Sequence, residues 1–390
     1  MTVARPSKAV VLVSSATAFS LLGDQALYAI LPIYFTELGL LPFQVGILLS
    51  ANRWIRLVTN HVAHVLAERF APAPLFVGAF VLGATITFAY ALYPTFALLL
   101  AARILWGLAW SFIRHIGVLA LLQDVPGTRT AQTMGYYNGI SRLGSIGGLF
   151  GGALLFDLFG YTNTFWILGF LGLASVVLSW PAAPPKLIAP EPATTDSGDH
   201  LGRHLGLLWL GFTLGGVGPG LVISTLGLVL NTRLEGELVI GGFTLGAATL
   251  TGAVLAARFL MDTVAAPWLG ALGDELGPRR ATTAFFAAGA LMLALAAYTT
   301  ELLPLCASII AFFMCGTALH AMVAGVAGKQ GGQRYARYVS ATDLGAAAGP
   351  LLGWLAVGTL DAENFAIVLA AGMYFLATTV APFTFPKMSG

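Results

Sequence analysis

Charged residues are scarce in this chain. Only 9% of its 390 residues are Asp, Glu, Lys or Arg, whereas 57% are hydrophobic, and the mean hydropathy is +0.84. Because soluble domains average about 25% charged residues, a water-soluble fold of this length would lack the polar surface it needs. The composition therefore argues against a soluble protein and indicates a chain whose solvent is the lipid bilayer.

Several other features are also missing or rare. The two cysteines, Cys306 and Cys315, are nine positions apart in one expected helix and point to different faces, so we expect them to pack rather than to bridge. The net charge of +2 gives no reason to expect nucleic acid. There is no phosphate-binding loop of the P-loop type, so ATP is not expected to supply the energy.

Chemistry at a metal or a nucleophile is not expected either. His61 and His64 are three positions apart but have no acid or cysteine beside them, so we expect no metal site. An intramembrane enzyme would be the alternative class, and it would need a nucleophile, a base and metal ligands at one depth. The sequence shows no such cluster, so we expect neither an enzyme nor a cofactor.

What the chain does have is apolar length. A membrane-spanning helix needs about 20 apolar residues, and backbone groups in lipid must be satisfied within the segment. The alternating polarity of a transmembrane barrel is absent. We therefore expect an all-α membrane protein with twelve spans, at 9–38, 44–65, 74–93, 96–120, 131–157, 162–182, 204–232, 239–264, 281–300, 303–325, 338–358 and 364–384. The first lacks a small-residue cleavage pattern, so we expect a spanning helix and not a signal peptide.

The basic residues favour one orientation. Most of those outside the spans fall at the ends of the chain and in alternate connections, whereas the opposite set of connections holds only Arg233. Since basic residues concentrate on the cytoplasmic side, we expect a multi-pass protein of the cell (inner) membrane with both termini in the cytoplasm.

The chain divides into two related halves. The only long polar connection, residues 184–203, is rich in Pro, Ser, Thr and acid and is expected to be a flexible cytoplasmic linker. It separates two expected six-helix bundles, 1–183 and 204–390. A shift of 206 positions aligns residues 65–74 with residues 271–280, and a shift of 201 aligns the small residues of 144–148 with those of 345–349.

The charged stretch LGALGDELGPRR, residues 269–280, carries the clearest motif. It resembles the G-x-L-a-D-x-x-G-r-r/k loop of the major facilitator superfamily, which lies between helices 2 and 3 and again between helices 8 and 9. The matching positions are Gly270, Gly273, Asp274, Gly277, Arg279 and Arg280. The first copy is degraded, with His64 in place of Gly, Glu68 in place of Asp and Ala71 in place of Gly. The resemblance implies the superfamily's twelve-helix fold, a gradient-driven transporter, and a monomer.

The expected fifth helix extends the resemblance. Gly135, Gly144, Gly148 and Gly152 follow the g-x8-G-x3-G-P-x2-G-G pattern of the superfamily's drug–proton antiporters, although Leu149 replaces the proline and Ala153 the last glycine. The alternative is that small residues here only let helices pack closely, as in any polytopic protein.

We also expect the GGVGPG stretch at 215–220 to weaken or kink its helix.

Six arginines fall inside the expected spans, Arg53, Arg56, Arg103, Arg114, Arg142 and Arg258, and the acids in comparable positions are Asp24, Asp262 and Asp343. A charge at the bilayer centre costs about 3 kcal/mol or more, so each should face a cavity or a partner. Arg114 and Arg258 could instead snorkel toward the cytoplasm.

Asp24 is the only acid expected near the midplane of the first half. A buried carboxylate has its pKa raised by desolvation and lowered by a nearby arginine, so a carboxylate balanced between these effects can bind and release protons. Arg103 fits the family's R-x-x-q-G element together with Gly107, with Trp106 at the Gln position, and in the family that Arg is tied to proton coupling. We therefore expect Asp24 and Arg103 to couple protons. The alternative is a static ion pair that orders the first bundle.

The repeat also suggests a gate. Under the two shifts Arg56 coincides with Asp262, and Arg142 coincides with Asp343. The superfamily fold implies that helix 2 faces helix 11 and helix 5 faces helix 8, which sets Arg56 opposite Asp343 and Arg142 opposite Asp262. We expect these pairs to close the cytoplasmic side. The alternative is that each charge is satisfied within its own half, for example by Arg258 with Asp262 at i,i+4.

Polar and aromatic residues of the first half are candidates for the substrate cavity: Gln25, Tyr28, Asn52, Arg53, Trp106, Trp110 and Tyr137. The excess of arginine favours an anionic or zwitterionic substrate, and the aromatic residues favour an amphipathic one, although large aromatics also serve as helix packing. The sequence therefore predicts a proton-coupled antiporter that exports a small amphipathic or anionic solute. The alternative is a proton- or ion-coupled importer or exchanger of an organic anion.

Overall fold

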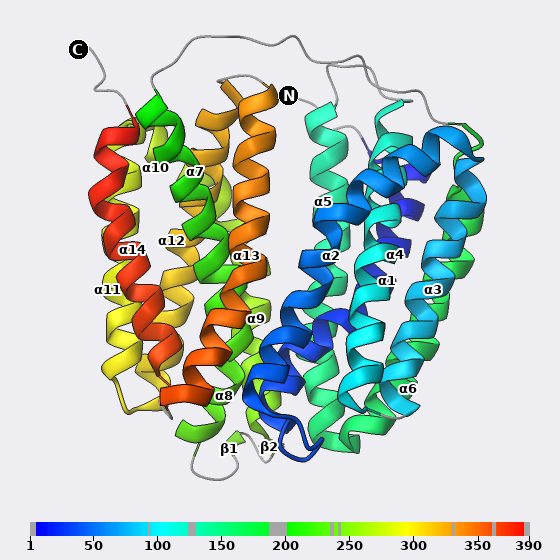
Figure 1. Ribbon diagram of the computed structural model, residues 1–390, viewed down its shortest axis with the longest axis horizontal. Helices are drawn as coiled ribbons and strands as arrows, with labels where there is room; N and C mark the ends of the chain where they lie inside the picture. The colour runs from blue at the N-terminus through cyan, green and yellow to red at the C-terminus, as the bar shows by residue number, and fades with distance from the viewer. Residues whose placement is uncertain are drawn as a thin grey trace. The chain divides into compact units, whose positions relative to one another are not determined.

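The computed structural model describes residues 5–92, 94–123, 130–186, 201–234, 238–240, 243–329, 332–360 and 364–385. These residues are almost entirely helical (Figure 1). The helices from the first half of the sequence are α1 (Lys8–Tyr34), α2 (Pro42–Arg69), α3 (Pro72–Leu92), α4 (Phe96–Gln123), α5 (Thr130–Ile146), the π-helical η2 (Gly147–Gly151) and α6 (Gly152–Ala182). Those from the second half are α7 (Leu201–Gly215), the π-helical η3 (Gly216–Val222), α8 (Ile223–Arg233), α9 (Ala247–Val264), α10 (Ala266–Leu276), α11 (Pro278–Tyr298), α12 (Leu302–Lys329), α13 (Gly332–Leu360) and α14 (Phe365–Thr384).

The helices have the length and apolarity of membrane spans. Within the described residues, 8 helical stretches are long and apolar enough to cross a bilayer, and one of them covers 51 residues, Gln132–Ala182. Its backbone leaves the helical region at Gly160, so this stretch holds two crossings. The helices α2, α9 and α13 have spanning length but carry the arginines and aspartates singled out above. Together these crossings agree with the twelve predicted spans.

The chain folds into two compact units. Unit 1 contains residues 1–40, 51–190 and 239–256, and unit 2 contains residues 41–50, 191–238 and 257–390. Each unit therefore holds most of one half of the sequence and a short segment of the other half.

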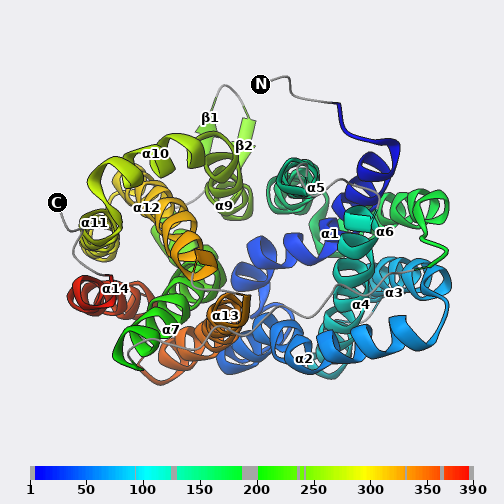
Figure 2. The same ribbon diagram turned by 90° about the horizontal axis from the view of Figure 1, so that it is seen from above.

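Close backbone contacts in unit 1 depend on glycine. Helix α1 packs against α5, η2 and α6 (Figure 2). A side chain at Gly144 would collide with the carbonyl oxygen of Ala18, and one at Gly148 would approach the carbonyl oxygen of Leu22 to 2.5 Å. Gly135, by contrast, faces open space. The prediction that small residues bring these helix backbones together is therefore confirmed at Gly144 and Gly148.

Unit 2 repeats this arrangement. Helix α13 packs against α7 and η3, and a side chain at Gly345 would collide with the carbonyl oxygen of Phe212. A side chain at Gly349 would lie 2.5 Å from the Cα atom of Gly220. Since Gly345 and Gly349 are the positions matched to the first half by the shift of 201, both copies of the repeat use glycine for the same purpose.

Two predicted distortions occur. All of the GGVGPG stretch except Gly215 lies in the π-helical segment η3. This segment includes Pro219, and proline cannot donate the backbone hydrogen bond of a regular helix. The predicted break after residue 157 occurs at Gly160, where φ is 76° and ψ is 174°.

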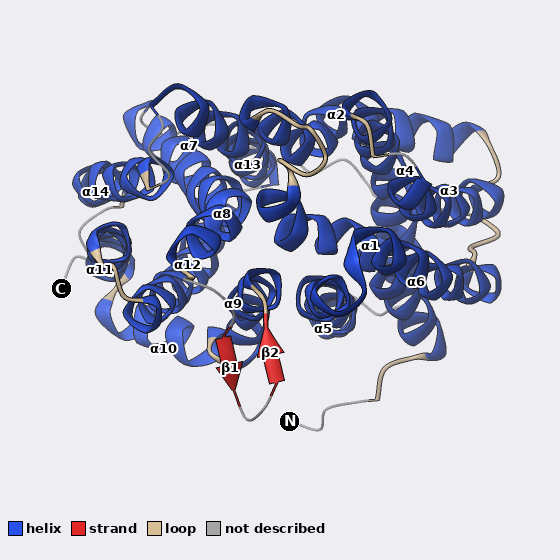
Figure 3. Ribbon diagram, turned by 90° about the horizontal axis from the view of Figure 1, so that it is seen from below, coloured by secondary structure: helices blue, strands red, loops and turns tan. Residues whose placement is uncertain are grey.

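Two predicted boundaries were wrong. The expected span at 239–264 begins only at Ala247, and it is preceded by two strands, β1 (Leu238–Ile240) and β2 (Phe243–Leu245), shown in red in Figure 3. Apolar, β-favouring triplets on either side of a Gly-Gly pair are typical of a hairpin. The charged motif is not a loop throughout, because α10 continues to Leu276 and only Gly277, at φ 76°, separates it from α11.

We expect Gly160→Ala to destabilise unit 1 by about 1–3 kcal/mol, because this combination of φ and ψ is open essentially only to glycine. Thermal unfolding of the purified protein in detergent would show a lower melting temperature. Gly78→Ala is the matched control, since Gly78 is exposed within α3 and faces open space. It should leave the melting temperature unchanged or raise it. Equal melting of the two variants would contradict the assigned backbone break.

Candidate functional site

A buried ion pair lies within unit 1. Asp24 comes from the middle of α1 and Arg103 from α4, and their side chains form a salt bridge through Arg103 Nη1 and Asp24 Oδ1. Asp24 is 5% exposed and Arg103 is 1% exposed. Such a pair is stable away from water only if its remaining donors and acceptors also find partners. The two residues predicted to act together are therefore in direct contact.

Neighbouring polar side chains supply those partners. The Gln25 Nε2 atom donates to Asp24 Oδ2 at 2.9 Å, and Arg103 Nη2 donates to the Tyr28 hydroxyl at 3.0 Å. Asp24 and Tyr28 are one turn apart on α1, so one face of this helix presents both to the guanidinium, and Gln25 contacts Asp24 from the adjacent position.

Two arginines share the Tyr28 ring. The guanidinium carbon of Arg103 lies 5.3 Å from the ring centroid, and that of Arg53 lies 5.5 Å from it. A cation within about 6 Å of an aromatic face is attracted by the ring quadrupole. The site thus gathers two cations, one carboxylate and one phenol, with positive charge in excess.

Two more polar groups lie at the edge of this group. The Asn52 Oδ1 atom makes no hydrogen bond to a described residue, and the Tyr90 hydroxyl is close enough to the Arg103 guanidinium to interact with its charge. Asn52 lies where α2 and α4 approach closely, because a side chain at Gly107 would come within 2.6 Å of the Asn52 carbonyl oxygen. Tyr90, in α3, was missed by the sequence reasoning. A tyrosine near the end of a predicted span gave no signal without knowledge of which helices adjoin α4.

Three of the predicted cavity residues contribute to packing inside unit 1. Trp106 is 3% exposed, and its ring lies 3.0 Å from where a side chain would begin at Gly83 of α3. Trp110 packs beside Trp106, with ring centroids 6.1 Å apart. Tyr137 is buried in the hydrophobic core formed by α1, α2, α3, α4 and α5.

The predicted gate residues are distributed over both units. Arg56 and Arg142 are partly buried in α2 and α5 of unit 1, and Asp343 is partly buried in α13 of unit 2. Asp262, in the unit 2 part of α9, accepts a hydrogen bond from the Thr317 hydroxyl. Its neighbour Arg258 lies 5.6 Å from the ring centroid of Phe313. The pairing of Arg56 with Asp343 and of Arg142 with Asp262 stays a prediction.

The two motif copies differ in structure. In the first, Glu68 lies in the last turn of α2, and its exposed Oε1 atom is 3.5 Å from His64 Nε2, so an acid does lie beside this histidine. In the second, Arg279 and Arg280 lie in the first turn of α11. Gly273 faces Met322, whose sulfur would be 2.5 Å from an added Cβ. The surroundings of Gly270 and the side chain of Asp274 are not among those that the structure describes. In the described parts of the chain, no three His, Cys, Asp or Glu side chains come together as metal ligands.

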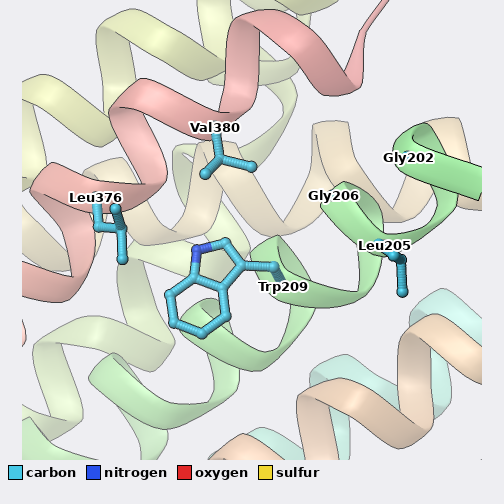
Figure 4. A pocket seen from close by; sticks show the side chains of 6 residues that line it. All are labelled: Gly202, Leu205, Gly206, Trp209, Leu376 and Val380. Atoms are coloured by element: carbon cyan, nitrogen blue, oxygen red, sulfur yellow. The ribbon is translucent and has the colours of Figure 1, made fainter.

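An open apolar groove lies on unit 2 between the start of α7 and the end of α14 (Figure 4). Trp209 lies in it, with Leu205, Leu376, Val380 and two glycines as its other lining residues. None of these side chains is charged, and none belongs to the group around Arg103. We therefore place the candidate site at the ion pair and not at this groove.

Comparisons with known sequences agree with this architecture. The profile of the Major Facilitator Superfamily matches residues 13–264. An MFS-type transporter of Methanocaldococcus jannaschii is 27% identical over 165 residues, which are 42% of each chain. The chromaffin granule amine transporter of Rattus norvegicus is 31% identical over 153 residues, 38% of this chain and 29% of that protein. The quinolone resistance protein NorA of Staphylococcus aureus is 24% identical over 159 residues, 40% of each. The matched region thus covers less than half of each curated relative.

Solved structures share the fold over nearly the whole chain. The nucleoside transporter NupG superimposes with a TM-score of 0.78 at 14% identity, covering 97% of this chain and 100% of that one. A POT family transporter bound to a thioalcohol-conjugated peptide gives a TM-score of 0.77 at 13% identity, covering 98% of this chain and 96% of that one. At such low identity these likenesses establish the fold alone.

We expect Tyr28→Phe to lower the free energy of unfolding by about 1–2 kcal/mol, because it removes the hydroxyl that accepts a hydrogen bond from the buried Arg103 guanidinium. Tyr28→Leu should cost more, since it also removes the ring that both arginines face. Thermal and denaturant unfolding of the purified protein would rank the variants. If Tyr28→Phe were as stable as the parent, the hydrogen bond would not contribute.

Proposed function

Because the chain belongs to the Major Facilitator Superfamily and is therefore a membrane transporter, we propose that it is a proton-coupled antiporter. It exports a small amphipathic or anionic solute by alternating access. The single observation that carries this proposal is the ion pair of Asp24 and Arg103, buried inside a bundle of apolar helices.

The ion pair provides a physical route for coupling. Removing one partner of a buried pair leaves an uncompensated charge, at a cost of about 3–5 kcal/mol. A proton on Asp24 has the same effect on Arg103, whose guanidinium then needs another anion or acceptor. The Tyr28 hydroxyl meets part of that need, and a bound solute can meet the rest. Protonation of Asp24 and binding of the solute are linked through Arg103 in this way.

The chemistry of the site supports the proposed class of solute. Arg53 and Arg103 lie over one tyrosine ring, so an anionic or strongly polar group on the solute would find positive charge there and an aromatic surface beside it. Two of the relatives are named for quinolone resistance and for amine transport, which supports a small organic solute with both apolar and polar parts.

A second candidate function is import or exchange of an organic anion by the same site. The excess of positive charge around Tyr28 favours it. The two functions differ in the sign of proton movement relative to the solute, because an exporter of this type moves them in opposite directions and a symporter moves them together.

The proposal includes an organisation and a location. The first six-helix bundle is residues 1–183, the linker is 184–203, and the second bundle is 204–390. Residues 187–200 of that linker lie outside the described part of the chain. We propose that the protein is a monomer in the cell membrane with both termini in the cytoplasm, as the distribution of its basic residues favours.

We expect Asp24→Asn to abolish solute transport driven by a pH gradient in proteoliposomes, because the amide cannot take up the proton. Gradient-independent exchange of solute should persist, and this separates loss of coupling from loss of binding. Asp24→Glu, which keeps an ionisable group, should retain part of the coupled transport. If pH-driven transport survives in Asp24→Asn, the coupling role is wrong.

Stability needs its own control in this experiment. Asp24→Asn leaves Arg103 without a buried counter-charge, so the variant should unfold more easily, by about 3–5 kcal/mol. The double variant Asp24→Asn with Arg103→Gln removes both charges and should regain much of that stability. It should still fail to couple transport to protons. A static structural pair would instead give a double variant that is both stable and fully coupled.

The predicted gate can be tested by charge exchange. We expect Arg56→Asp and Asp343→Arg each to slow transport, because each puts like charges opposite one another. Combining them restores the attraction with its polarity reversed, and transport should recover substantially. Transport rates in proteoliposomes, matched for protein content, would be compared. A double variant no better than either single variant would exclude this pair.

A further inference from the structure

Two equivalent helix contacts occur in the structure, one in each unit. In unit 2, the beginning of α2 packs against α13, where Gly46 faces the carbonyl oxygen of Pro350 and the Cβ atom of Trp354. In unit 1, the beginning of α9 packs against η2 and α6, where Gly252 faces the carbonyl oxygen of Leu149 and the Cβ atom of Ala153. The shifts of 206 and 201 convert each residue of the first contact into its counterpart in the second.

The two contacts differ at their outer ends. Asp157 lies two helical turns after Leu149, on the same side of the helix. Its counterpart under the shift of 201 is Gly358. A side chain at Gly358 would only touch the ring of Pro42, at 3.5 Å. Asp157 instead reaches the first turn of α9, where its Oδ2 atom accepts from the Thr249 backbone N–H at 2.8 Å and from the Thr249 hydroxyl at 2.5 Å.

Asp157 therefore caps α9 from another helix. A helix N-terminus has backbone N–H groups with no partner in the helix, and the residue just before the helix usually supplies a side-chain oxygen to the third N–H. In α9 that preceding residue is Gly246, which has no side chain. The carboxylate of Asp157 occupies the space that a side chain at Gly246 would need, because a Cβ atom there would lie 2.5 Å from Asp157 Oδ1. The carboxylate of Asp157 thus takes the place of a local cap.

The equivalent helix start is capped locally. The Leu41 backbone N–H, at the start of α2, donates to the Gln44 side-chain oxygen at 2.9 Å, and α2 begins with Pro42, whose missing N–H needs no partner. The start of α2 therefore uses a side chain from its own first turn. The start of α9 depends on a residue from the other half of the sequence.

We propose that Asp157 is a positioning residue that holds the start of α9 against η2 and α6 in one conformation of the transport cycle and releases it in the other. The inference rests on the proposed alternating access, in which the two halves of the sequence move against each other. The contact lies at the end of α9 opposite the basic motif, which is the expected extracellular side. Releasing it exposes the carboxylate and the N–H groups of α9 to water, so this contact closes that end more firmly than the uncharged contact of α2 with α13 does.

The test measures opening of the contact directly. Ala153→Cys, in a background without Cys306 and Cys315, places a thiol at a fully buried position beside Gly252. The thiol reacts with a water-soluble maleimide only when the contact opens. Asp157→Ala should raise the labelling rate of the purified full-length protein about tenfold, as expected for the loss of hydrogen bonds to a charged group. Asp157→Asn keeps an acceptor oxygen but loses the charge, so it should raise the rate less.

A second variant tests whether Asp157 holds two helices together or only caps the N-terminus of α9. Asp157→Ala frees the space beside Gly246, so Gly246→Ser in the same variant can supply a cap from within α9. If Asp157 holds two helices together, labelling in this double variant stays as fast as in Asp157→Ala. Return of the rate to the parent value would overturn the proposal, because Asp157 would then serve only the stability of α9.

A matched control tests whether loss of any helix cap has the same effect. Gln44→Ala removes the local cap of α2 at the equivalent place and should leave labelling of the Ala153 position at the parent rate. An equal increase in Gln44→Ala, or no increase in either Asp157 variant, would overturn the proposal. If Asp157→Ala does not fold, Asp157→Asn decides. Labelling needs neither a proton gradient nor solute, so its outcome is separate from the test of proton coupling at Asp24.

Discussion

A fully buried arginine, Arg103, imposes a strong physical constraint on unit 1. The guanidinium of Arg103 cannot lose its proton within the range that proteins experience, so it must keep a negative or strongly polar partner wherever α4 places it. Asp24 and Tyr28 from α1 meet that requirement. The relative positions of α1 and α4 are thus set by charge as well as by packing. A transporter can use this constraint, since any change in the charge of Asp24 changes what Arg103 must bind.

Glycine provides the second constraint. In lipid, two helices gain little from burying apolar side chains and much from close backbone packing. In unit 1, Gly144 and Gly148 let α5 and η2 lie directly on α1, and in unit 2 Gly345 and Gly349 let α13 lie on α7 and η3. Both sets sit beside a π-helical segment, a form of helix that is frequent at functional sites. The duplication is therefore visible in the way the helices pack as well as in the sequence.

The sequence predicted features that depend on local chemistry. The membrane class, the spans, the distortion of 215–220 and the pairing of Asp24 with Arg103 all follow from composition, from short patterns, or from the rule that a charge in lipid needs a partner. Few residues could satisfy that rule for Arg103, and Asp24 was the only acid at a suitable depth in the first half. The pairing could thus be inferred without knowing the fold in detail.

What the sequence left open depends on how distant segments meet. Trp106 and Tyr137 are as aromatic as a cavity wall would be, and only the position of α3 shows that Trp106 packs against Gly83. The hairpin before α9 was hidden because its residues are apolar enough to extend a span. Asp157 was not singled out because it stands at the end of a predicted helix, where a charge is common. The available signal was Gly246, which directly precedes α9 and has no side chain to cap it.

An internal duplication initially gives two helix contacts of the same strength, here those of α2 with α13 and of α9 with η2 and α6. In an alternating-access transporter, the two contacts must open and close at different stages of the cycle. If both contacts had the same strength and the same chemistry, nothing in them would favour one conformation over the other. In this chain the glycines that permit close approach, Gly46 and Gly252, are kept in both copies, whereas the capping group is not. The shared part lets the helices meet, and Asp157 sets how firmly one of the two contacts is held. A single carboxylate at one of two equivalent positions can thus favour the conformation in which that contact is closed, while the glycines that permit close packing stay the same in both copies.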